Sequence, residues 1–348
     1  MLYLSGTPEQ IGLAHGHLLR DEIGSANRRF LESFEALPER NRERLQRALQ
    51  RLEQRTPAAY LAEMRAIARG AGLSYEQVLF LNNLTTLSEG ERCFAFSAWD
   101  REGRLMTFRQ IDSNSDMYEQ MVLFIVRPDR GHAFAALLNP GWVDGETGMN
   151  ARGLTLSQNN IGIRQTAWNV TPVTILTRHI LQHASTIDEA FAILRGQDAW
   201  PARLLFVSQP EGAAVFEMAN GHLQRLQMSE EGLALANHPR RVPADDISAN
   251  SVRRLEHADR YLAEHRARIS IDQGIALLRS PTISSFVRNG FTNKQSVVFR
   301  PATLDFWIAL RPDGRFRAAA SGAYEGFNLA AELGAGTGRP VPQRIPAR

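Results

Sequence analysis

The apolar and polar positions divide the chain into zones of different periodicity. Up to about residue 90, apolar residues recur with the 3.6-residue period of amphipathic helices. The first predicted helix begins after Thr7 as N-cap, with Pro8 at its first position. Further helices are predicted in the charged stretch 25–55, over 57–69, and over 74–82, where Ser74-Tyr-Glu-Gln77 forms a capping box.

From residue 93 the period changes to two, as in strands that alternate between two faces. The predicted strands are 93–99, 104–111, 119–127, 132–138, 141–148, 153–160, 203–208, 212–218, 222–227, 232–236, 295–300, 303–311 and 315–320. The predicted helices among them are 172–184, 186–195, 251–265 and 271–278.

Runs of strands separated by runs of helices are typical of an α+β fold with mostly antiparallel sheets. We therefore predict two sheets packed face to face and covered by helices on both outer sides, a four-layer αββα sandwich. Residues 1–92 form a helical segment around a core of residues 93–333. Residues 334–348 are rich in Gly and Pro and are predicted to be an extended or disordered tail.

Composition narrows the class of protein. Of 348 residues 43% are hydrophobic and 22% are charged, which is ordinary for a globular domain. A single cysteine excludes an intramolecular disulfide and a cysteine-based zinc site, and we predict no metal. The net charge is only +3, and no basic run is interleaved with aromatic residues, so nucleic acid is not expected as a partner. Neither a signal peptide nor a run long enough to span a bilayer is seen, so we expect a cytoplasmic protein.

The single cysteine, Cys93, heads a predicted hairpin that turns at Asp100-Arg-Glu-Gly103. A single cysteine is most often a small buried apolar residue without chemistry. Arg109 and Asp112 follow it by 16 and 19 positions, so the second strand would return them beside the first. The guanidinium could lower the pKa of the thiol and the carboxylate could hold an ammonium group. The alternative is an ordinary surface ion pair.

A cysteine nucleophile needs a base. Nine histidines are scattered along the chain, so a Cys-His pair stays open as one solution. The other is the α-amino group of Cys93 itself, whose ordinary pKa of about 7.7–8.0 suits a base at neutral pH. That solution requires cleavage of the Arg92–Cys93 bond. The preceding residues 85–92 are polar and loop-like, although an ordinary helix-to-strand connection would look the same.

A second group of candidate residues follows the turn at Gly148-Met-Asn150. The strand after this turn ends in Asn159 and Asn160. An amide NH₂ group there could donate a hydrogen bond to a developing oxyanion. Two asparagines that simply end a strand in a turn are the alternative.

These residues resemble motifs of one family, the acyl-coenzyme A:6-aminopenicillanic-acid acyltransferases, and of their relatives, the choloylglycine hydrolases. The resemblance extends over about residues 1–310. It is carried by Gly6-Thr-Pro-Glu-Gln-Ile-Gly12 with His15-Gly16, the hairpin Cys93–Asp112, Gly148-Met-Asn-Ala-Arg-Gly-Leu154, Arg178-His-Ile-Leu181 with Ser185–Ala190, Asn237-His238, and Ser251-Val-Arg-Arg-Leu255.

The resemblance implies an N-terminal-nucleophile hydrolase that is made as a precursor and cut before the cysteine. Residues 1–92 would then be the α subunit and residues 93–333 the β subunit. By resemblance Cys93 is the nucleophile, Arg109 and Asp112 match catalytic residues, and Asn159 or Asn160 matches the oxyanion asparagine. Arg254, Arg203 and His238 are assigned to substrate binding.

The implied reaction is hydrolysis or transfer of an acyl group from a small-molecule amide or thioester, through a thioester on Cys93. No cofactor is expected, although an acyl-coenzyme A thioester is a candidate donor, and a homo-oligomer is compatible with the sequence. The family usually has Gly before the nucleophile and Thr or Ser after it, where this chain has Arg92 and Phe94. A family asparagine expected near 202–204 is replaced by Ala202-Arg203-Leu204. An uncleaved Cys-His acyltransferase and a non-catalytic ligand-binding protein of the same fold are the alternatives.

Overall fold

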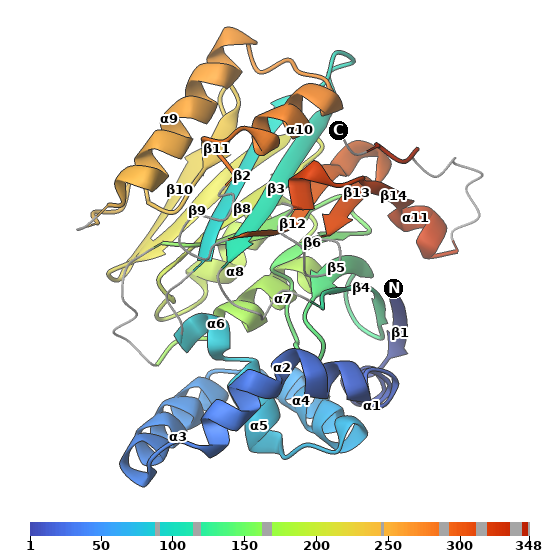
Figure 1. Cartoon of the computed structure of the whole chain (residues 1–348), viewed down its shortest axis with the longest axis vertical. Helices are drawn as coiled ribbons and strands as arrows, with labels where there is room; N and C mark the ends of the chain where they lie inside the picture. The colour runs from blue at the N-terminus through green and yellow to red at the C-terminus, as the bar shows by residue number, and fades with distance from the viewer. Residues whose placement is uncertain are drawn as a thin grey trace.

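The structure is a computed structural model that describes residues 1–87, 91–113, 120–161, 169–244, 247–284, 292–310, 319–334 and 343–346. Its strands form two sheets that lie face to face (Figure 1). All neighbouring strands in the sheets are antiparallel except β1 and β4, which are parallel.

The larger sheet has eight strands in the order β1-β4-β5-β6-β7-β8-β9-β10. Their bounds are β1 Leu2–Gly6, β4 Val122–Pro128, β5 Phe134–Leu138, β6 Thr147–Asn150, β7 Thr155–Asn160, β8 Arg203–Gln209, β9 Gly212–Ala219 and β10 His222–Gln227. The smaller sheet has six strands in the order β11-β2-β3-β12-β13-β14. Their bounds are β11 Leu233–Leu235, β2 Glu91–Trp99, β3 Leu105–Ser113, β12 Thr292–Arg300, β13 Asp305–Leu310 and β14 Glu325–Asn328.

Helices cover the outer side of each sheet. Helices α7 (Val173–His183) and α8 (Ile187–Arg195) pack on the eight-stranded sheet, and α9 (Ala249–Glu264) and α10 (Ile271–Arg279) pack on the six-stranded sheet. A short helix, α11 (Leu329–Glu332), follows β14. The predicted four-layer αββα sandwich is therefore confirmed.

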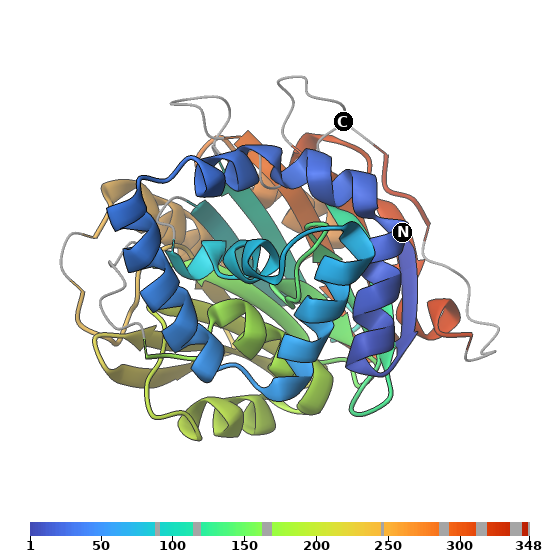
Figure 2. The same cartoon turned by 90° about the horizontal axis from the view of Figure 1, so that it is seen from below.

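The N-terminal helices lie across one end of this sandwich and form a frame around it in Figure 2. They are α1 Pro8–Leu18, α2 Arg20–Glu35, α3 Glu39–Gln54, α4 Ala58–Ala71, α5 Tyr75–Leu81 and α6 Leu84–Leu87. Two of the predicted helix starts are confirmed: Thr7 is the N-cap of α1, and the capping box of Ser74 begins α5. Helix α4 ends at Gly72, whose positive φ of 74° favours glycine.

Helices α1 and α4 pack unusually closely. A Cβ atom added at Gly12 would lie 2.2 Å from the carbonyl oxygen of Glu63, and one at Gly16 would lie 2.3 Å from that of Ile67. Only glycine permits this approach, which explains two glycines in the N-terminal motif. Among the described helices, none combines the length and apolar character that crossing a bilayer requires.

Several predicted elements differ from the observed ones. The sequence prediction missed β1, and the helical stretch 25–55 is two helices separated at Pro38, which limits helix continuation. The predicted strand 141–148 is paired only from Thr147, because residues 141–146 turn inward as irregular buried backbone. The predicted strand 315–320 lies largely outside the described residues, although Ala319–Ser321 form a short 3-10 turn.

The segment before Cys93 also differs from the predicted loop. Leu84–Leu87 are helical, and Glu91 and Arg92 belong to β2, where Arg92 pairs with Asp112 of β3. The Arg92–Cys93 bond therefore lies within a paired strand. In the tail, Ile345 exchanges two backbone hydrogen bonds with Tyr324, whereas 335–342 lie outside the described residues.

Candidate active site

Cys93 is fully buried in β2, opposite Ile111 of β3. Side chains of a strand alternate between its faces. Cys93 belongs with Ile111 to the large hydrophobic core, whereas Phe94 and Phe96 belong to the cluster that α9 and α10 cover. The thiol therefore lies on the face of the small sheet that meets the large one.

Arg109 lies on this same face of the hairpin, opposite Ala95, and is completely buried. Its Nη1 donates to Asn159 Oδ1 at 2.5 Å and its Nη2 donates to the carbonyl oxygen of Gln158 at 2.5 Å. Asn159 in turn donates through Nδ2 to the carbonyl oxygen of Ala236 at 2.7 Å. The predicted hairpin arginine and one of the two predicted asparagines thus meet between the sheets.

Glu146 is a member of this cluster that the sequence analysis missed. Its Oε1 lies 3.4 Å from Arg109 Nη2, and both side chains are buried. With its amide oriented to satisfy both neighbours, Gln158 donates to Glu146 Oε1 at 3.2 Å and accepts from Arg203 Nε at 3.2 Å. The signal available in the sequence was an acidic residue just before the Gly148-Met-Asn150 turn.

Asp112 lies three residues beyond Arg109, and alternation places it on the other face of β3. It accepts a hydrogen bond of 2.9 Å from Asn293 Nδ2 of β12. Asn293 also accepts from the backbone N–H of Ala320 at 2.7 Å. The predicted return of Asp112 beside the start of β2 is confirmed by its pairing with Arg92.

Arg254 of α9 reaches β2, the strand of Cys93, from the outer side. Its Nη1 donates to the carbonyl oxygen of Cys93 at 3.2 Å, and its Nη2 donates to Asn237 Oδ1 at 2.5 Å. Burial lowers the pKa of the guanidinium, and the charges of Asp112 and Cys93 oppose that shift. Asn237 Nδ2 donates to the carbonyl oxygen of Asn160 at 2.7 Å, so the network returns to the end of β7.

His238 follows Asn237 in the chain and contacts this network only through Ser251 among the bonds described. Its Nδ1 lies 2.7 Å from Ser251 Oγ, which also accepts from the N–H of Asn237 at 2.7 Å. Burial lowers the pKa of His238, and the charge of Arg240 adds to the effect, so the ring is neutral at pH 7. The Asn237-His238 and Ser251-to-Arg254 motifs therefore meet, and Asn237 joins the cluster more directly than His238 does.

Arg203 is buried and reaches the Arg109 cluster only through Gln158 among the bonds described above. Its Nη1 donates to the carbonyl oxygen of Ala202 at 2.7 Å, and its Nη2 donates to the carbonyl oxygen of Thr85 in α6. It thus connects the start of β8 to α6, the helix that precedes β2. Within the described residues, no cluster of three or more His, Cys, Asp or Glu side chains is arranged to hold a metal ion.

The fold is of the N-terminal-nucleophile hydrolase type. A mutant form of the conjugated bile acid hydrolase from Clostridium perfringens has a similar structure, with a TM-score of 0.51 and 10% sequence identity. The match covers 72% of this chain and 96% of the hydrolase. A penicillin V acylase from Agrobacterium tumefaciens matches with a TM-score of 0.48, 13% identity and coverage of 68% of this chain and 86% of the acylase.

A family model described as acyl-coenzyme A:6-aminopenicillanic acid acyl-transferase matches residues 99–299, which is more than half of the chain. The chain belongs to this family. The match begins just after Cys93 and includes Arg109, Asp112, Asn159 and Arg254.

A protein of uncharacterized function from Archaeoglobus fulgidus is 25% identical over 258 residues. These are 63% of this chain and 43% of that relative, so the chain spans less than half of the relative's length.

Proposed function

We propose that the chain is a cysteine amidase or N-acyltransferase that acts on a small-molecule amide or thioester after cutting itself between Arg92 and Cys93. One observation carries the proposal. Arg109 follows the thiol on its hairpin and donates to Asn159, which ends a strand 50 residues later in the other sheet, at 2.5 Å. Two separately predicted candidate residues are thus in direct contact, on the face of the hairpin that carries Cys93.

The first step is maturation. Cys93 Sγ attacks the carbonyl carbon of Arg92, the C–N bond breaks, and the nitrogen of Cys93 takes the thiol proton. Water then hydrolyses the resulting thioester, which leaves a carboxylate on Arg92 and a free α-amino group and thiol on Cys93. The bond to Arg254 at the Cys93 carbonyl and the pairing of β2 with β3 support a strand that keeps its place after the cut.

In turnover, the α-amino group takes the thiol proton and Sγ attacks the substrate carbonyl carbon. The amine leaves with that proton, and the acyl group stays on Sγ as a thioester. Water completes hydrolysis, or an amine completes transfer, and the thiol is regained. Arg109 favours the thiolate by charge, and Asp112 favours the ammonium form of the α-amino group. An amide NH₂ at the end of β7 stabilises the oxyanion.

The test is covalent trapping of the acyl group. Purified protein is mixed with a panel of N-acyl amines and acyl thioesters, quenched in acid, and digested for mass spectrometry. We expect an acyl adduct on the peptide that begins at Cys93, and none in Cys93→Ala. Turnover without any adduct, and with full activity in Cys93→Ala, would show that the chemistry lies elsewhere.

A further inference from the structure

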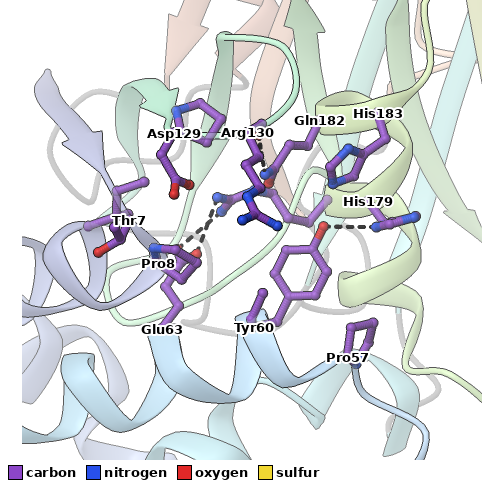
Figure 3. A pocket seen from close by; sticks show the side chains of 14 residues that line it. Thr7, Pro8, Pro57, Tyr60, Glu63, Asp129, Arg130, His179, Gln182 and His183 are labelled. Atoms are coloured by element: carbon purple, nitrogen blue, oxygen red, sulfur yellow. Dashed lines mark hydrogen bonds and ion pairs between the residues drawn. The ribbon is translucent and has the colours of Figure 1, made fainter.

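A cavity of about 410 Å³ lies on the helical side of the large sheet, whereas Cys93 lies between the sheets. Its lining comes from the start of α1, the first turns of α4, the second half of α7, and the turn after β4 (Figure 3). None of the lining residues belongs to the cluster around Cys93. The volume is within the range of about 300–1,000 Å³ that is typical of small-molecule sites.

The floor of this cavity is a closed ion pair. Arg178 Nη1 and Nη2 lie 3.2 Å and 3.2 Å from the two oxygens of Glu63, and both residues are buried. Arg178 Nε donates to Gln182 Oε1 at 3.2 Å. The two opposite charges neutralise each other, so the floor offers no net charge to a ligand.

One wall is aromatic and uncharged. Tyr60 Oη lies 3.0 Å from His179 Nδ1, and the rings of His179 and His183 lie 4.5 Å apart. Burial and the neighbouring His183 lower the pKa of His179 to about 4, and burial also lowers that of His183. Both imidazoles are neutral at pH 7, and Pro8 and Ile11 make the opposite wall apolar.

Two exposed charges of opposite sign line the same cavity. They are Asp129 and Arg130, which are adjacent in the turn after β4. Figure 3 shows both side chains at the cavity together with Tyr60 and Glu63. In the part of the chain that the structure describes, neither of these two charged side chains has an ion-pair or hydrogen-bond partner.

This balance of charges selects the kind of ligand. A purely anionic ligand would pair with Arg130 but be repelled by the carboxylate of Asp129. A purely cationic ligand would pair with Asp129 but be repelled by the guanidinium of Arg130. A ligand with one charge of each sign matches both groups. The apolar and aromatic walls add affinity for a ligand body without charge.

We propose that this cavity binds a free α-amino acid with an apolar or aromatic side chain. Its carboxylate pairs with Arg130, its ammonium group pairs with Asp129, and its side chain packs against Tyr60 and Ile11. The site is separate from the nucleophile and does not depend on the reaction proposed for Cys93.

The test is isothermal titration calorimetry on the full-length protein, with and without Cys93→Ala, so that binding at the nucleophile is recognised. The probes are L-phenylalanine and L-leucine, compared with N-acetyl-L-phenylalanine, which lacks the ammonium group, and L-phenylalaninamide, which lacks the carboxylate. We expect saturable binding of both amino acids and at least about tenfold weaker binding of both derivatives, since each loses one charge-assisted bond.

Substitutions of the two charged cavity residues then test whether the amino acid binds in this cavity. Arg130→Gln and Asp129→Asn should each weaken L-phenylalanine binding by about tenfold or more, whereas the matched surface variants Arg44→Gln and Asp21→Asn should not change it. Thermal unfolding checks that all four variants remain folded. Three results would each overturn the proposal: no binding at millimolar amino acid, equal binding of N-acetyl-L-phenylalanine, or binding that survives both cavity variants.

Discussion

Arg178 and Arg109 are each buried against a glutamate, and the two pairs differ in how many hydrogen bonds the guanidinium makes. Arg178 meets both oxygens of Glu63 at 3.2 Å and uses its Nε for Gln182. Arg109 has a single longer contact of 3.4 Å with Glu146, and its Nε has no hydrogen-bond partner among the described atoms. We call the Arg178–Glu63 pair the closed pair and the Arg109–Glu146 pair the open pair.

This difference in bonding corresponds to the different positions of the two pairs in the fold. The closed pair joins α4 to α7 and so fixes the N-terminal helices on the core. The open pair lies between the sheets and includes Arg109 of the β2–β3 hairpin, which also donates to Asn159. In the function that we propose, a guanidinium that is only partly neutralised keeps charge for the thiol, whereas a fully neutralised one contributes mainly to structure.

The largest expected effect follows from removing the thiol of Cys93. Cys93→Ala should lower acyl transfer by about a thousandfold or more, because it removes the nucleophile. It should also stop cleavage before residue 93, while the thermal unfolding midpoint changes little. Cys93→Ser is the matched control, since it keeps the size and a weaker nucleophile. Activity that persists at the wild-type level in Cys93→Ala would remove the role given to Arg109 as well.

The next effect is on stability, at the closed pair. Glu63→Gln should lower the free energy of unfolding by about 3–5 kcal/mol, because it leaves the charge of Arg178 buried without its partner. The double variant Glu63→Leu with Arg178→Met should regain most of that loss, since two apolar residues replace the whole pair. Urea unfolding measures both. A loss below about 1 kcal/mol in Glu63→Gln would mean that the pair does not hold the helices as described.

A substitution in the open pair should change the activity more than the stability of the protein. Glu146→Gln removes a negative charge beside Arg109, so the positive charge should lower the pKa of the thiol further. We expect the acidic limb of the kcat/KM profile to move to lower pH, and kcat/KM at neutral pH to fall about tenfold as Arg109 loses an orienting partner. The stability loss should be smaller than in Glu63→Gln. An acidic limb that moves to higher pH would contradict the role of the open pair.

The smallest effect concerns the pH dependence of stability near the closed pair. The buried His15 accepts a hydrogen bond of 2.8 Å from the N–H of Gly141. Burial, with the nearby charge of Arg178, lowers its pKa from 6.5 to about 3. Between these pH values the unfolded chain binds a proton that the folded chain does not bind, so stability falls as pH falls.

The slope from this one group is at most about 1.4 kcal/mol per pH unit. His15→Gln keeps an acceptor for Gly141 without a titrating ring. Its stability should therefore depend on pH less steeply, by about one proton, in denaturant unfolding between pH 6 and about pH 4. Equal slopes in the two proteins would show that His15 is protonated in the folded state.

Much of the core could be predicted because its signals are local. Alternation, capping boxes and turn residues predicted both sheets, the hairpin from Cys93 to Asp112, and the helices on each side. The prediction missed β1 because five residues, Leu2–Gly6, carry little pattern and pair in parallel with β4 more than 100 residues later. Such a pairing leaves no trace in the periodicity of either segment.

The members of the candidate site that were missed depend on contacts between distant segments. Glu146 lies in a buried segment whose apolar residues resemble a strand, and only the meeting with Arg109 reveals its place. Asn237 was noted in a motif, but its bonding partners Arg254 and Asn160 lie in two distant elements, α9 and β7. Arg203 was predicted to bind substrate, and the sequence carries no signal for its observed bond to the carbonyl oxygen of Thr85.

The claim that Cys93 becomes an N-terminal nucleophile is tested most directly by intact-mass spectrometry of the purified full-length protein, beside Cys93→Ala. The prediction is two fragments in the wild-type protein, with masses that sum to the full chain plus one water and with the larger fragment starting at Cys93. Cys93→Ala should stay as one uncut chain. A wild-type chain that stays uncut while it turns over substrate, or a cut that also occurs in Cys93→Ala, would contradict it.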